Sequence, residues 1–120
     1  MTIPTTPQQP EPWLRGTYSE LPAVLRAVLH AFELAQEDVH KWTADLSDAE
    51  LQSSPAGLTP LSFHLRHIPG ALDRLLTYAE GHQLSAEQLA ALRAEQEPGG
   101  LRDELFAAFN NGLAAAARRV

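Results

Sequence analysis

Two histidines three residues apart, His64 and His67, are the residues of this 120-residue chain whose type and spacing point to chemistry. They belong to the stretch FHLRHIPG. Imidazole is the usual nitrogen ligand of protein-bound metals, and neighbours on one side of a helix can converge on one ion. The spacing fits equally well two histidines at the edge of a core, each bonded to protein through one ring nitrogen and to water through the other. Spacing alone leaves both interpretations open.

The two histidines lie on one flank of the apolar stripe of their predicted helix. On a helical wheel His64 lies about 60° from the centre of the stripe and His67 about twice as far round. Arg74 and Tyr78 share the flank of His67. We therefore predict that these two residues bind an anionic group or orient water if a pocket exists there.

Pro69 lies inside the same predicted helix. Because proline has no N–H, it removes the hydrogen bond to the carbonyl of Leu65 and bends the axis. The bend would fall beside His67, where it could shape a site. It fits equally well a helix that simply curves around its neighbours.

An earlier predicted helix carries a second set of candidate ligands at helical spacing: His30, Glu33, Glu37 and His40. On a wheel these residues lie about 100° to 180° from the apolar stripe of their helix. We therefore predict a solvated charged face here rather than a site.

The apolar positions predict three long amphipathic helices. The first spans about 19–46, with Ser19 as N-cap and Pro22 in the first turn. Its apolar stripe recurs in steps of three and four: Leu21, Leu25, Val28, Phe32, Ala35, Val39, Trp42 and Leu46. The second runs from Thr59 to Gly81, and the third follows the Pro98-Gly99-Gly100 breaker.

Two short helices connect the long ones. Ser47 with Glu50 and Ser85 with Gln88 form capping boxes, with an apolar residue just before each serine and another four residues after it. No alternation typical of strands occurs between these segments. The fold class is therefore an all-α, up-down helical bundle of three long helices plus short connecting helices.

Composition limits the classes of function. A formal charge of −6 opposes the phosphate attraction on which nucleic-acid binding depends, so we expect no nucleic-acid partner. The absence of cysteine excludes disulfides and thiolate ligands, so any metal must be held by His, Asp or Glu. No apolar run is long enough for a transmembrane helix and no signal peptide is recognisable, which predicts no membrane association and a cytoplasmic location.

The chain divides into an arm and a domain. Residues 1–16 contain four prolines and read as an extended arm, from which Trp13 and Leu14 are expected to pack on the body. Residues 17–120 form the bundle domain.

The stretch PLSFHLRHIPGALDRLLTYAEG, preceded by LSDAELQSSPAG, resembles the DinB/YfiT-like superfamily of bacterial four-helix-bundle metalloenzymes over about residues 11–120. The resemblance implies an up-down-down-up bundle and a divalent metal, often zinc or nickel, held by three histidines. One of these corresponds to His67, and the other two form an H-x-x-x-H pair on a fourth helix. Some members catalyse thiol-dependent transfer or isomerisation, whereas most have no assigned substrate.

This chain departs from the family pattern in two ways. We expect it to be C-terminally short, since the sequence ends at Val120 after the third long helix and has no H-x-x-x-H pair, and position 69 is proline instead of a small residue. We therefore expect His67 to be the remnant or a partial supply of a metal site, with His64 as its neighbour or substitute.

Two functions follow from these expectations. The first is a truncated relative that dimerises or binds a small molecule, because three helices patterned for a four-helix bundle leave an apolar face that a homodimer would cover. Its ligand would be a small hydrophobic molecule or a thiol. The alternative is a divalent-metal-dependent S-transferase or isomerase that uses His67, with further ligands from His64 or a second chain.

Overall fold

The computed structural model describes residues 9–120, and in this range its regular secondary structure is all helical, which confirms the all-α class. The helices are η1 (Pro12–Leu14), α1 (Ala23–Thr43), α2 (Asp48–Gln52), η2 (Pro55–Gly57), α3 (Leu61–Ala79), α4 (Ala86–Ala94) and α5 (Arg102–Arg119). Among these described helices, none combines the length and apolarity needed to span a bilayer.

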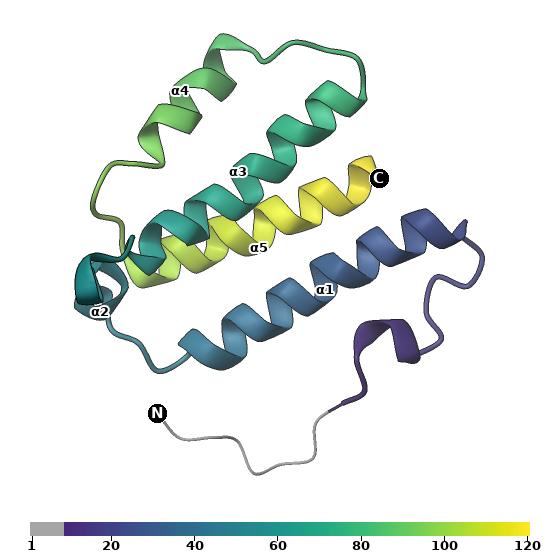
Figure 1. Cartoon of the computed structure of the whole chain (residues 1–120), viewed down its shortest axis with the longest axis horizontal. Coiled ribbons are helices and arrows are strands. Elements are labelled where there is room, and N and C mark those ends of the chain that lie inside the picture. Colours follow the sequence, from purple (N-terminus) through teal and green to yellow (C-terminus); the bar gives the residue numbers. More distant parts are fainter. Residues whose placement is uncertain (1–8) are drawn as a thin grey trace.

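The three long helices lie side by side, with α5 between α1 and α3 (Figure 1). The short α4 flanks α3, and η1 flanks α1 on the opposite edge. Side-chain contacts fix the directions of the helices. Arg119, at the end of α5, bonds Glu80 just beyond α3, whereas Arg102, at the start of α5, bonds the carbonyl of Leu46 just beyond α1. Helices α3 and α5 therefore run parallel, and α1 runs antiparallel to both.

Side-chain caps set the starts of α2 and α4. Ser47 and Ser85 form the predicted capping boxes, with both reciprocal hydrogen bonds present. The predicted cap at Ser19 is wrong, because α1 begins at Ala23 with Pro22 as its N-cap. The physical reason is that a residue before proline is disfavoured in the helical region, so Leu21 cannot join the helix.

The core is centred on α5. Its inward residues are buried: Leu105, Phe106, Phe109 and Leu113. They pack with Leu51 of α2 and Leu65 of α3, which are buried as well. At the crossing of α3 and α5, Gly112 lies against Pro69, and a Cβ at position 112 would overlap the proline ring. The proline predicted to bend α3 beside His67 therefore has a packing role toward α5.

The apolar stripe of α1 is much less covered than that of α5. Of the eight stripe positions expected from the sequence, none is fully buried, and Leu25 and Trp42 are exposed. On α3, Leu61 and Leu75 are exposed as well. Trp13 and Leu14, expected to pack on the body, stay more than half exposed although η1 lies against α1; of the arm residues 9–16 that the structure describes, Pro12 is buried.

Candidate functional site

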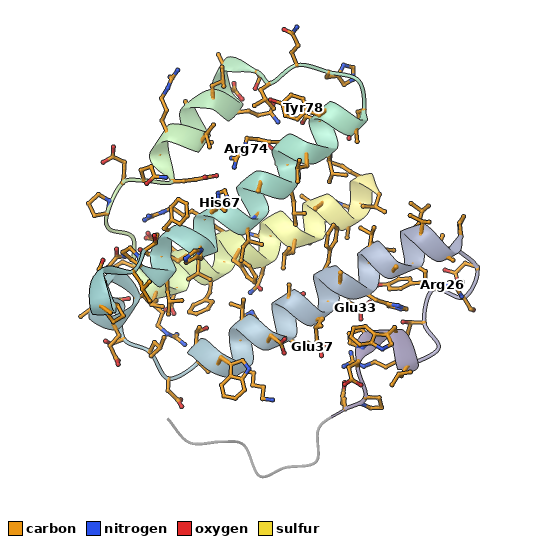
Figure 2. The ribbon with its side chains drawn as sticks, in the orientation of Figure 1. Arg26, Glu33, Glu37, His67, Arg74 and Tyr78 are labelled. Carbon is orange, nitrogen blue, oxygen red and sulfur yellow. The ribbon has the colours of Figure 1, made fainter. Side chains whose placement is uncertain are left out.

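His67 lies on the side of α3 that faces α4 and contacts a carboxylate from that helix (Figure 2). Its Nδ1 is 3.0 Å from Oε2 of Glu95, the residue that ends α4. The Glu95 side chain is only 5% exposed, whereas the His67 side chain is 42% exposed. A buried carboxylate thus holds an accessible imidazole.

Arg74 completes this arrangement, which we call the α4 clamp (His67, Arg74 and Glu95). Its Nη1 donates to Oε1 of Glu95 at 2.6 Å, so each carboxylate oxygen has its own partner. Gly70 makes room for the carboxylate, because a Cβ at that position would overlap Glu95 Oε1. Without paired donors a buried carboxylate would be strongly destabilising, so the clamp anchors α4 to α3.

The orientation of the His67 ring follows from its two contacts. An ionised carboxylate can only accept hydrogen bonds, so Nδ1 carries the proton and donates it to Glu95. The ring also stacks on Phe63, with centroids 5.0 Å apart and an interplanar angle of 13°. The lone pair of Nε2 therefore points away from Glu95, and no hydrogen bond to Nε2 exists within residues 9–120. Such a nitrogen can act as a ligand, a base or a nucleophile.

His64 has different surroundings. Its ring meets the edge of Phe63, and it lines a surface depression of about 470 Å³ with Leu58, Leu61 and Glu50. His64 therefore takes no part in the α4 clamp.

The metal expected from His67 and His64 stays a prediction. In the described part of the chain, no three His, Asp or Glu side chains are placed to hold an ion together. A catalytic zinc normally has three protein ligands. The residues described in one chain therefore do not fit such a centre.

The two predicted flank residues, Arg74 and Tyr78, have different surroundings. Arg74 joins His67 through Glu95, whereas Tyr78, one turn further along α3, is exposed and takes no part in the hydrogen bonds of the clamp (Figure 2). Their predicted role in ligand binding stays a prediction.

On the opposite edge of the molecule, residues 12–18, which we call the strap, cover part of α1. Thr17 Oγ1 is 3.0 Å from Nε2 of His30, and the Tyr18 ring lies 5.5 Å from the imidazole. His30 is 3% exposed, so the predicted solvated face is wrong there. His40 also contacts protein, since its Nε2 is 2.7 Å from Asn110 of α5.

Charge pairing attaches the strap at the surface. Both terminal nitrogens of Arg15 donate to Glu37, at 2.6 and 2.8 Å. The hydrogen bonds from Arg15 hold the pKa of Glu37 below its ordinary value. In the same region, burial raises the pKa of Tyr18, and the nearby charge of Glu33 raises it further.

Sequence reasoning missed Glu95, because no fixed spacing links a residue of α3 to one that lies 28 positions later, at the C-cap of another helix. Gly70 was a signal in the sequence that another group lies close to α3 beside His67. A helical glycine three residues after a histidine indicates that another group approaches closely there.

No protein-family model, curated protein or solved structure matches the chain.

Proposed function

We propose that the chain is a DinB-like helical bundle module that acts by self-association, with its open apolar face covered by a second copy. The helix directions support the DinB-like part of this proposal. Helix α1 runs opposite to the parallel pair α3 and α5, which is the order up, down, down of the first three helices in that superfamily.

The main support for self-association is that the apolar stripe of α1 is incompletely buried. Six of the eight expected stripe positions lie on this helix, yet within the chain each of them stays exposed or half-buried. Helix α5 shows the contrast, since its stripe is buried. Exposed apolar surface gathered on one element marks an association site, and its burial would contribute about 25 cal/mol per Å².

Sedimentation across micromolar concentrations tests self-association. The wild-type chain should sediment as a dimer, whereas Leu25→Glu should sediment as a monomer. Leu92→Glu is a matched control, because Leu92 on α4 is 37% exposed against 36% for Leu25 and lies on the opposite edge of the molecule. A monomeric wild type, or equal loss of dimer in both variants, would overturn the proposal.

Small-molecule binding is a second use of the module that one observation favours. Three apolar residues, Pro55, Leu58 and Leu61, line part of the depression beside His64. A small hydrophobic ligand suits such a surface. Titration with an environment-sensitive apolar dye should show saturable binding that Leu58→Glu abolishes; linear, unsaturable fluorescence would exclude it.

The metal-dependent transferase is less well supported, because a second chain would have to supply ligands. Elemental analysis of dialysed protein separates the two functions. Near-stoichiometric zinc or nickel that disappears in His67→Ala would favour the enzyme.

A further inference from the structure

The α4 clamp gives His67 Nε2 the properties of a nucleophile. Hydrogen bonding of Nδ1–H to Glu95 fixes the tautomer in which the Nε2 lone pair is available, and the Phe63 stack fixes the plane of the ring. The exposed ring is accessible to a partner that approaches from solvent.

Glu95 also matches the charge that develops when this nitrogen attacks an electrophile. An imidazole that forms a bond through Nε2 while keeping its proton on Nδ1 becomes an imidazolium. Its positive charge then faces the buried carboxylate 3.0 Å away, where a charge-assisted hydrogen bond is stronger than in water. The clamp therefore stabilises the product of Nε2 attack more than the free ring.

Arg74 bears on which electrophile fits. Only its Nη1 contacts Glu95, and among the described residues its other N–H groups have no hydrogen-bond partner. The Arg74 side chain is only 11% exposed and bonds Glu95, from which Nε2 points away, so its role is to offset the charge of the carboxylate beside the imidazole. Both carboxylate oxygens of Glu95 are occupied by donors, which limits the repulsion of an incoming anion.

We infer that His67 is a phosphoryl-acceptor residue that takes a phosphoryl group from a phosphoramidate-type donor onto Nε2. The Nε2 lone pair forms a bond to phosphorus as the P–N bond of the donor breaks, and the donor nitrogen, already protonated, leaves as ammonia. The product carries the phosphoryl group on Nε2 and the proton on Nδ1, opposite Glu95. Arg74 and Glu95 act as positioning residues.

Potassium phosphoramidate is the probe, used with the full chain in the presence of a chelator. Phosphopeptide mapping under non-acidic conditions should locate one phosphoryl group on His67, formed at least about tenfold faster than on His64 or His82, given the strength of charged hydrogen bonds. ³¹P NMR should identify the Nε2 isomer. Equal labelling of the histidines, or no labelling of His67, would overturn the inference.

The ring nitrogen of His67 that becomes phosphorylated distinguishes a positioning role of Glu95 from a merely structural one. In Glu95→Ala the Nδ1 atom loses its partner, so phosphorylation of His67 should become a mixture of the Nδ1 and Nε2 isomers. Glu95→Gln, which keeps an acceptor for Nδ1–H, should retain the Nε2 isomer but react about tenfold more slowly. Glu80→Gln is the control and should match wild type. Unchanged isomer and rate in both Glu95 variants would refute the role of Glu95, and selectivity within the wild-type chain tests His67 even if a variant misfolds.

Discussion

Two polar clamps hold the peripheral segments on the long helices, and they use the same residue types in opposite ways. In the α4 clamp the carboxylate of Glu95 is buried and the imidazole of His67 is exposed. Where the strap meets α1, the imidazole of His30 is buried, whereas the carboxylate of Glu37 is 45% exposed. Each clamp also contains one arginine that bonds the carboxylate.

The difference separates a structural histidine from one that is free to react. Nε2 of His30 is bonded to Thr17 inside a covered contact, whereas Nε2 of His67 points away from its carboxylate partner on an accessible ring. Burial of the carboxylate orients the imidazole without blocking it. Helical spacing, which groups candidate ligands on both helices, carries no information about this distinction.

Removal of Glu95 should break the α4 clamp and give the largest loss in the free energy of unfolding. Glu95→Ala leaves the largely buried Arg74 guanidinium without its partner, and breaking a buried pair costs about 3–5 kcal/mol. Urea unfolding measures the loss. Glu37→Ala, the matching change at the strap, should cost far less because that pair is exposed; equal losses would show that burial does not distinguish the clamps.

Gly70→Ala should destabilise the chain, although alanine is ordinarily favoured over glycine in a helix by roughly 0.5–1 kcal/mol. The added Cβ would overlap Glu95 Oε1 and approach Arg74, so we expect a net loss of about 1–3 kcal/mol. Hydrogen exchange should show faster exchange in α4 while α1 is unaffected. A stabilised variant would mean that Glu95 does not occupy this space.

His30→Ala should cost about 1–3 kcal/mol, because it leaves a cavity under the strap and removes the bond to Thr17. His82→Ala, in an exposed turn, should stay within about 0.5 kcal/mol of wild type. Thermal unfolding compares the two. Indistinguishable variants would remove the structural role assigned to His30.

The smallest effect concerns the exposed pair of the strap. Because the folded-state pKa of Glu37 is lowered from 4.5, its contribution to stability is fully present above that value and is lost as the pH falls through the lower folded pKa. The urea midpoints of wild type and Glu37→Gln should therefore differ slightly at neutral pH and converge as the pH falls through the lowered pKa of Glu37. A gap that widens in acid would contradict the lowered pKa.

Sequence patterns predicted the features that depend on neighbouring residues. Both capping boxes and the third long helix after the Pro98-Gly99-Gly100 breaker were correct, because a cap needs only a few neighbouring residues and an amphipathic helix only the helical period. The start of α1 was wrong at Ser19, since a proline three residues later overrides a favourable cap.

The candidate site was predicted only in part. His67 and Arg74 could be grouped because they share a face of one helix. Glu95 could not be found, since its contact depends on how α4 returns along α3. The cover over His30 was missed for the same reason, because the strap belongs to a segment with no periodic pattern.

The parallel course of α3 and α5 bears on how long the connection between them must be. The chain has to travel back along α3, a distance of about 28 Å for its 19 residues. The segments on either side of α4, residues 80–85 and 95–101, could extend to about 40 Å on their own. The return path therefore does not require a helix, and the added length of α4 serves to deliver one carboxylate to one imidazole.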